Sequence, residues 1–402
     1  MNPAPRRIAP LAITAQGLAS AAGIGLAPLA KLLRAGGSAL TPLTGLPAAP
    51  PCWAGRVPGL ESAPLPAAWA EWDCRATRLA WQGLRADGFL TAAQAACARH
   101  GAGRVGLVLG TSASTIAASE QAYATLDADG SFPPALRSER LNTLHALAAF
   151  VQLATGLQGP CVTVSTACSS SAQAFAQAER WLRLDLADAV VVAGVDALCA
   201  SLFFGFHALG LLAPTPCQPF AAARCGISIA EAAGYALLER GTGPWQLLGW
   251  GAANDAHHMS SPHPQGLGAE RALDDALARS GLAAEDIDYL NLHGTATPLN
   301  DAVEAALVAR RYSPGVYASA SKGATGHAMG AAGIVEALVC GLALREELGS
   351  GSAGTAAVDP ALGAVFAGQL RKAPSLCTAR VAASHSFGFG GNNAVLIFGG
   401  SA

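Results

Sequence analysis

The fold of this chain is decided by the sequence VTVSTACSSS at residues 162–171. A β-branched run at 162–164 enters a turn of small residues, and a helical pattern follows at 172–182. Cys168 therefore lies at the N-terminal end of a predicted helix, where free N–H groups lower the pKa of a thiol and can bind an oxyanion. A buried, inert cysteine is the alternative, since cysteine is among the most buried residues. The stretch predicts a strand–turn–helix unit of an α/β fold, with Cys168 as a candidate nucleophile.

The same alternation of short apolar runs and helical patterns continues along most of the chain. We expect strands at 105–109, 161–165, 189–194, 235–239, 247–251, 287–292, 381–386 and 394–398, and helices at 168–183, 269–280, 301–311 and 330–345. Runs that are apolar on both faces and separated by helices are typical of a largely parallel sheet with covered faces. The segments 40–72 and 350–375 read as irregular loops.

The composition excludes several classes of protein. Hydrophobic residues make up 51% of the 402 residues and charged residues 13%, so we expect a large core and a surface partly covered by a partner or a second copy. A net charge of −2 offers no basic field for nucleic acid or an anionic membrane. No apolar run reaches the ~18–20 residues of a membrane span, so no membrane insertion is expected.

The ten cysteines occur singly and form no CxxC pair, which argues against structural zinc and favours the reducing cytoplasm. Arg6-Arg7 and the apolar run at 8–13 resemble a weak secretory signal. Because Gln16 interrupts this pattern early, we instead expect a first buried strand.

Three further turns carry residues suited to catalysis. His293 follows a predicted strand in NLHGTATP at 291–298, although a lone histidine there is more often structural. Lys322 and His327 lie in SKGATGHAMGAAG at 321–333, which fails as a phosphate loop because the lysine precedes the glycines. Phe389 and Gly390 lie in SFGFGGNN at 386–393, which lacks the spacing of a dinucleotide-binding loop.

Together these four turns resemble the β-ketoacyl synthase branch of the thiolase-like enzymes. The cysteine turn resembles the nucleophile segment of that family, and Phe389-Gly390 lie in its G-F-G-G turn. His293 lies in its H-G-T-x-T-x-x-x-D segment, and Lys322 and His327 in its K-x-x-x-G-H-x-x-G-A-A-G segment. The supporting residues of the histidine segment are Thr295, Thr297, Asp301 and, downstream, Glu304. The likeness runs from residue 8 to 398 and is strongest for the elongating type, while 204–212 and 255–264 resemble synthases of bacterial aryl-polyene pathways.

The resemblance implies a thiolase-like fold of two similar βαβαβαββ halves in a layered αβαβα arrangement. Residues 1–240 would carry Cys168, and residues 241–402 would carry Lys322 and both histidines, with the active site where the halves meet. The family pairs through a central strand, which implies a homodimer or a heterodimer with a second ketosynthase-like subunit.

The resemblance also implies the reaction, a decarboxylative Claisen condensation of an acyl thioester with malonyl-acyl carrier protein in fatty acid or polyketide chain elongation. Cys168 would carry the acyl group, and the N–H groups of Cys168 and Phe389 would bind the oxyanion. His293 and His327 would be neutral donors to the enolate, Lys322 would pair with Glu304, and Phe389 would be a gate. The acyl carrier protein is the implied partner, and no cofactor or metal is implied beyond its phosphopantetheine arm.

Four positions depart from the family pattern: Ala221 and Cys225 replace acidic residues, and Ala230 and Ala232 replace glycines. A chain-length-factor-like partner subunit of a ketosynthase heterodimer is therefore an alternative. A biosynthetic thiolase is less consistent, because it normally needs a second cysteine where this chain has Phe389.

Other polar groups admit both structural and functional interpretations. Asp255 with His257, His258 and His263 could suggest a metal site, but we favour a structural or pocket-lining loop. Arg75 and Arg78 fit a solvated helix face or a dimer edge. Glu336 and Asn392 fit a buried ion site or core hydrogen bonds.

Overall fold

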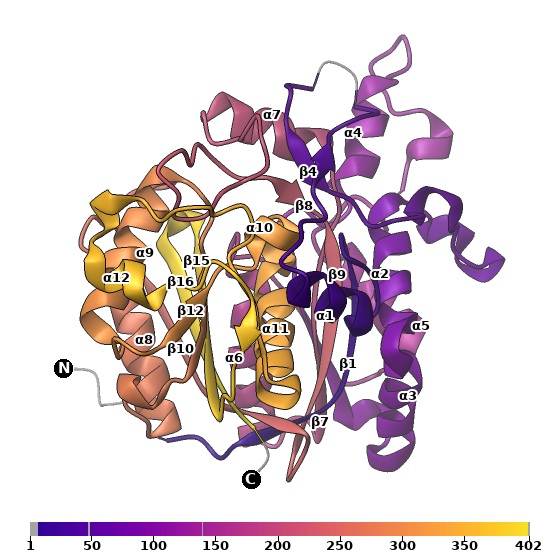
Figure 1. Cartoon of the computed structure of the whole chain (residues 1–402). Helices are drawn as coiled ribbons and strands as arrows, with labels where there is room; N and C mark the ends of the chain where they lie inside the picture. Colours follow the sequence, from indigo (N-terminus) through magenta and orange to yellow (C-terminus); the bar gives the residue numbers. More distant parts are fainter. Residues whose placement is uncertain (1–6, 47–48, 139, 401–402) are drawn as a thin grey trace.

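The computed structural model describes residues 7–46, 49–138 and 140–400 (Figure 1). Its main element is an 11-stranded mixed sheet, with ten strands in one row and the short strand β2 (Gly23–Ile24) paired beside them. Five strands of the first half follow the spatial order β6 (Cys161–Val164), β5 (Val105–Gly110), β7 (Ala189–Asp196), β9 (Ala232–Arg240) and β1 (Leu11–Ser20). The second half continues with β10 (Trp245–Asn254), β16 (Asn392–Gly400), β15 (Val381–Gly388), β11 (Tyr289–Asn291) and β12 (Tyr317–Ser319).

The strand order repeats between the halves, with β1, β5, β6, β7 and β9 matched in sequence order by β10, β11, β12, β15 and β16. The two halves are joined in the sheet by a short pairing of β1 with β10, Leu11 opposite Leu247 and Ala12 opposite Gln246. The described part of the chain thus has a twofold internal repeat of one sheet topology.

The predicted parallel character holds only toward the two ends of the sheet. The pairs β5–β6, β5–β7, β11–β12 and β11–β15 are parallel, whereas the five central pairs from β7 to β15 are antiparallel. The physical reason is clearest at β15 and β16, which are joined by a short turn containing Gly390 at φ 75° and Gly391 at φ 72°. A connection this short can only produce an antiparallel pair.

Helices cover both faces of each half, and two of them lie in the middle layer. α11 (Ala332–Glu346) is apolar on all sides and buried from Ala332 to Ala343, and it contacts strands of both halves. α6 (Ser170–Arg183) packs beside α11 in the same layer. The outer helices of the first half are α2 (Arg75–Arg85), α3 (Phe89–His100) and α5 (Ala146–Thr155); those of the second are α8 (Leu267–Ser280), α9 (Pro298–Arg311) and α12 (Ala364–Gln369). The predicted thiolase-like αβαβα layering is confirmed.

The other elements are short or lie at the ends of the sheet. They comprise α1 (Leu26–Arg34), α4 (Ile116–Ala124), α7 (Ala200–Ala208), α10 (Lys322–Thr325), β2 (Gly23–Ile24), β3 (Thr41–Pro42), β4 (Trp53–Gly55), β8 (Ile229–Ala230), β13 (Leu348–Gly349) and β14 (Ser375–Leu376). The loops predicted at 40–72 and 350–375 are thus only partly irregular, since they contain β3, β4 and α12. The predicted first strand is confirmed as β1.

Close backbone contact positions α6 behind β5. A Cβ placed on Gly110 at the end of β5 would lie 2.3 Å from the backbone nitrogen of Ser171 in the first turn of α6. Only glycine permits this approach. The contact sets the height of α6 above the sheet, and with it the place of Cys168 just before the helix.

The two ends of the main sheet differ in how they are covered. At β12, Leu370 bridges to Ala318 and the Arg371 N–H donates to the Ala318 carbonyl at 2.7 Å. β6 forms the other edge of the sheet. Its side chains are half-buried, and its outer side pairs with no other strand within the described residues. Open edges of this kind are sites for pairing with another chain.

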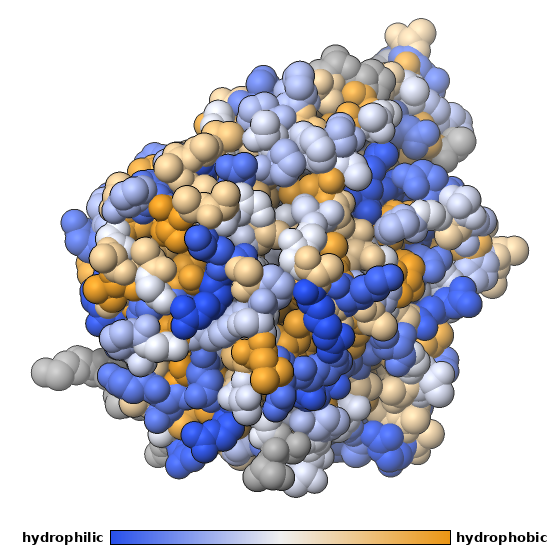
Figure 2. All heavy atoms as spheres, viewed as in Figure 1, coloured by the Kyte–Doolittle hydropathy of each residue, from blue (hydrophilic) through white to orange (hydrophobic). Residues whose placement is uncertain are grey.

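The face in Figure 2 is a mosaic of hydrophilic residues and small apolar patches. Of the helices in the described ranges, none has the length and apolar character needed to cross a membrane.

Candidate active site

Cys168 occupies a strained turn between β6 and α6. The preceding Ala167 has φ 52°, a left-handed conformation that is costly for a residue with a Cβ. The Ser170 hydroxyl accepts from the Thr166 N–H at 2.9 Å and donates to the Ala167 carbonyl at 2.5 Å, which holds the turn. Cys168 itself is buried, with 5% of its surface exposed. The turn therefore presents the thiol inward, toward the second half of the chain.

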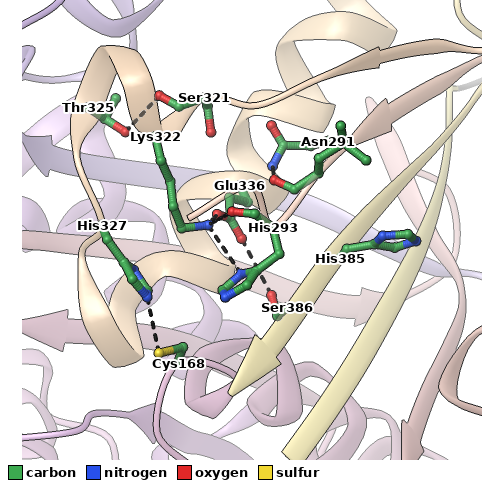
Figure 3. Close-up of polar contacts among 12 residues, drawn as sticks. Cys168, Asn291, His293, Ser321, Lys322, Thr325, His327, Glu336, His385 and Ser386 are labelled. Atoms are coloured by element: carbon green, nitrogen blue, oxygen red, sulfur yellow. Dashed lines mark hydrogen bonds and ion pairs between the residues drawn. The ribbon is translucent and has the colours of Figure 1, made fainter. Parts of the chain in front are cut away.

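Both predicted histidines lie beside this thiol (Figure 3). His327 Nε2 is 3.0 Å from Cys168 Sγ, and the His293 and His327 rings are perpendicular with centroids 5.4 Å apart. One ligand atom of each of the three residues lies within 4.8 Å of the others. The structure thus brings together residues from the first and the second half of the chain.

The hydrogen bonds assign one tautomer to each imidazole. The Met329 N–H donates to His327 Nδ1 at 3.2 Å, and the Lys322 ammonium donates to His293 Nδ1 at 3.2 Å. An imidazole nitrogen that accepts carries no proton, so in the neutral rings the proton lies on Nε2. Burial, reinforced by the charge of Lys322, holds the pKa of both histidines well below the ordinary value, which keeps them neutral. Both residues are therefore Nε2–H donors, and that of His327 faces Cys168.

Lys322 pairs with Glu336, and its predicted pairing with Glu304 is wrong. The Lys322 ammonium contacts the Glu336 carboxylate directly and donates to the His293 carbonyl at 2.5 Å. Burial raises the pKa of Glu336 to about 7, although Lys322 opposes the shift. Glu304 lies on α9 and instead accepts the backbone N–H groups of His293 and Gly294, both at 2.8 Å. The lysine thus holds the His293 ring, and Glu304 holds the His293 turn.

The predicted lowering of the Cys168 pKa is wrong. Burial raises the pKa of Cys168 to about 11, although Lys322 and the backbone N–H of Phe389 oppose this shift. α6 begins at Ser170, two residues beyond Cys168, so the thiol is not part of the helix's first turn. The resting residue is a thiol.

The glycine turn at the start of β16 closes over Cys168. A Cβ placed on Gly388 would lie 3.2 Å from the Cys168 nitrogen, so this turn is packed against the nucleophile. The Phe389 ring lies 5.5 Å from that of Phe206 on α7, and the Gly390 carbonyl accepts from the Asn254 side chain at 2.8 Å. Gly390 lies in the left-handed region that suits glycine.

A pocket of about 380 Å³ leads from the surface to these residues. Its lining includes Cys168, both histidines, Phe389, Leu209 and Leu299. Thr295 and Thr297 also line it, with their hydroxyls 2.9 Å apart. Asp301 lies below this wall, where it accepts the Phe220 N–H at 2.7 Å, and burial raises its pKa to about 7.

Two residues of the network, His385 and Tyr312, were not predicted from the sequence. His385 on β15 lies 3.0 Å from Glu304 and 2.7 Å from the Tyr312 hydroxyl. His385 lies inside β15, three residues before the strand ends at Gly388, and this position gave no signal of its own. Only the fold reveals that it faces Glu304.

The donor atoms of Cys168, His293 and His327 could in number hold a soft metal ion. They fit one poorly, because both Nε2 atoms carry protons and the buried Lys322 ammonium adjoins His293. Asp255, considered for a metal cluster, instead accepts the N–H groups of His263 at 3.1 Å and Gly268 at 3.0 Å. Asp255 thus holds its loop and also lines the pocket, the structural or pocket-lining role that we favoured.

The remaining candidates have structural partners. Arg75 forms a bidentate pair with buried Glu231, and Arg78 pairs with Asp73. Asn392 donates to the Phe389 carbonyl at 3.3 Å.

A thiolase-like fold with a buried cysteine beside two neutral imidazole donors defines a condensing acyltransferase. Models of the β-ketoacyl synthase N-terminal and C-terminal domains match residues 74–242 and 246–354. The chain belongs to the β-ketoacyl synthase family. Its relatives include nodulation protein E of Rhizobium meliloti, 34% identical over 75% of this chain and 77% of that protein. The mitochondrial 3-oxoacyl-[acyl-carrier-protein] synthase of Arabidopsis thaliana is 37% identical over 62% of this chain and 58% of that protein.

Solved structures agree with this assignment. A chain from the complex of the ketosynthase ApeO with its chain length factor ApeC from Xenorhabdus doucetiae matches with a TM-score of 0.88 and 33% identity, over 98% of this chain and 98% of that one. The ishigamide ketosynthase/chain length factor matches with a TM-score of 0.85 and 26% identity, covering 99% of this chain and 100% of that one.

Proposed function

We propose that this chain is a ketosynthase that elongates an acyl chain held on Cys168 with a malonyl unit delivered by an acyl carrier protein. The observation that carries the proposal is the placement of two neutral Nε2–H donors beside one buried thiol at the end of an apolar-walled pocket. This arrangement suits a reaction in which negative charge develops first on a thioester oxygen and then on an enolate oxygen.

The first half-reaction is acyl transfer. Cys168 sulfur attacks the carbonyl of the incoming acyl thioester, and the carbon–sulfur bond to the carrier arm breaks. The thiol proton ends on the released carrier thiol, so the step is balanced. The N–H groups of Cys168 and Phe389 are the proposed oxyanion donors, and the packing of the 388–389 turn on Cys168 supports this role.

The second half-reaction is decarboxylation followed by condensation. The malonyl carbon–carbon bond breaks, CO₂ leaves, and its electron pair forms an enolate whose oxygen lies between His293 and His327. The enolate carbon then attacks the acyl-Cys168 carbonyl, and the Cys168 thiolate leaves. Each donor to such an oxygen is worth roughly 3–4 kcal/mol. Lys322 keeps the His293 donor on Nε2, and Phe389 gates access to the thiol.

The substrate carrier and partner follow from the same site. We expect Thr295 and Thr297 to line the path of a phosphopantetheine arm, and that arm is the one organic group that the proposal requires. Asp301 and Glu304 hold the turn that carries these threonines. Two structural relatives are ketosynthase complexes with a chain length factor. Together with the open β6 edge, they support a dimer formed with a second ketosynthase-like subunit or a second copy.

The aryl-polyene pathway and the cytoplasm are the proposed setting. The likeness to the ApeO complex supports the first, and ten free cysteines suit the reducing compartment.

Replacement of the nucleophile tests this proposal. Purified protein is mixed with acyl- and malonyl-carrier protein, and protein and product masses are followed. Wild type should form an acyl adduct on Cys168 and a β-keto product two carbons longer, whereas Cys168→Ala should form neither. Cys225→Ala is the matched control, because Cys225 is exposed. Turnover by Cys168→Ala would refute the mechanism, and activity only beside a sister subunit would favour the chain-length-factor-like role.

A further inference from the structure

A chain of hydrogen bonds reaches the His293 turn from the far side of the core. His385 is fully buried on β15, between the Tyr312 hydroxyl at 2.7 Å and the Glu304 carboxylate at 3.0 Å. The same carboxylate binds the backbone N–H groups of His293 and Gly294. Three buried side chains thus form one connected path that ends on the backbone of a site residue.

The donors and acceptors of this path fit one proton arrangement. Glu304 already accepts two backbone N–H groups, so His385 Nδ1 contributes its proton to the carboxylate. His385 Nε2 then accepts the Tyr312 O–H, which has no other acceptor within the described residues. An imidazolium would leave the Tyr312 proton without an acceptor. The neutral Nδ1–H tautomer satisfies every member of the path.

The path holds the two N–H groups of the His293 turn, which Lys322 does not contact. Lys322 donates to the His293 ring and carbonyl, whereas Glu304 fixes the peptide groups on which the ring is mounted. Gly294, directly after His293, has φ 42°, a left-handed conformation that suits glycine, and the two N–H bonds to Glu304 fix the peptide groups on both sides of His293. Orientation of Glu304 therefore determines where the His293 Nε2–H points.

We propose that His385 is a positioning residue that orients Glu304 and, through it, the His293 turn for malonyl decarboxylation. The inference rests on the proposed ketosynthase function. His385 lies two bonds of the path away from the substrate pocket and does not line it. Its effect is confined to the half-reaction that uses His293, while acyl transfer to Cys168 depends on the Cys168 and Phe389 turns.

Separate measurement of the two half-reactions tests this role. One assay follows single-turnover release of CO₂ from malonyl-carrier protein, and the other follows acyl adduct formation on Cys168 by mass. His385→Leu removes both hydrogen bonds and should slow decarboxylation roughly 10- to 100-fold, the loss expected from misplacing a group by about 1 Å. Acylation should stay within about twofold of wild type, because its donors lie elsewhere.

Two conservative variants separate positioning from packing. His385→Asn keeps an N–H donor close to the position of Nδ1 and should restore most of the decarboxylation rate. Tyr312→Phe leaves His385 in place but removes the hydroxyl that keeps the His385 proton on Nδ1. This variant should slow decarboxylation by a smaller factor and leave acylation unchanged. If the leucine variant does not fold, this pair carries the test.

Equal loss of both half-reactions, or unchanged decarboxylation beside a lower melting temperature, would overturn the inference. Failure of wild type in either assay is a different result. It would refute the proposed function before any variant is compared, and the inference would fall with it.

Discussion

Removing the charge of Glu336 should lower both the stability of the protein and its rate of decarboxylation. A double variant should then separate these two effects. Lys322 and Glu336 have side chains only 2% exposed, and they contact each other directly. Glu336→Gln leaves a buried ammonium without its counterion, which costs about 3–5 kcal/mol. This is a large share of a total unfolding free energy of about 5–15 kcal/mol. We expect the urea midpoint of Glu336→Gln to fall accordingly.

The same change should damage decarboxylation through His293. Without the Glu336 carboxylate, the Lys322 ammonium loses the partner that holds it against His293 Nδ1, and this nitrogen is left free to carry the ring proton. The His293 proton then moves from Nε2 to Nδ1, and one enolate donor is lost. Loss of one such donor corresponds to roughly a 10²- to 10³-fold slower step.

A double variant isolates the two effects. Lys322→Met with Glu336→Gln removes the whole pair and should recover most of the stability, because a neutral buried pair carries no unpaired charge. It should not recover decarboxylation, because no donor remains for His293 Nδ1. Urea unfolding and single-turnover CO₂ release measure the two properties. A Glu336→Gln variant as stable as wild type, or a double variant that decarboxylates normally, would refute the reasoning.

Two further predictions concern pH and packing. Because the pKa of both His293 and His327 is lowered, the unfolded chain takes up protons below its ordinary histidine pKa of about 6.5 while the native site does not. The contribution of these two histidines to stability should therefore fall as pH drops below about 6.5, so urea unfolding of wild type should lose more stability between about pH 7.5 and 5.5 than that of His293→Gln; equal losses would contradict neutral, buried donors. Gly110→Ala should lose about 3 kcal/mol or more of unfolding free energy, because its Cβ would lie 2.3 Å from the Ser171 nitrogen. Gly103→Ala, where a Cβ meets nothing within 4 Å, is the control, and equal urea midpoints for the two would disprove the packing argument.

The residues that the sequence revealed share one property: they stand in turns whose composition is unusual. Cys168, His293 and Lys322 each follow a short apolar run and are surrounded by glycine, serine or threonine. Such turns at strand ends are where α/β folds place their sites. The strands were found for a similar reason, since buried runs of β-branched residues are local signals.

The partners of these residues were not predictable in the same way. Glu336 lies in α11, whose neighbours are apolar on every side, so its sequence context does not indicate which cation it faces. His385 and Glu304 are 81 residues apart, and only the tertiary fold brings their side chains, from β15 and α9, into contact. The antiparallel centre of the sheet also depends on long-range order: β1 pairs with β9 and β10, more than two hundred residues later. Pairings of this kind arise from the tertiary fold.

The four departures from the family pattern bear on the choice between an active synthase and a chain-length-factor-like subunit, and the structure shows how the chain accommodates three of them. Where acids are missing at 221 and 225, Arg224 pairs with Asp359 at 2.6 Å. The methyl group of Ala230 has room because it faces glycine: a Cβ on Gly55 or Gly326 would lie 2.7 Å from it.

Ala230 also keeps a direct link to the site. Its N–H donates to the His327 carbonyl at 2.9 Å, while the Ser228 carbonyl accepts the His327 N–H at 2.8 Å. Both bonds hold the backbone of the residue whose ring lies 3.0 Å from Cys168. A subunit that only shaped a partner's tunnel would have no need to retain this support beneath a complete set of donors. The compensation at Arg224 and Ala230 therefore favours a chain that performs the condensation itself.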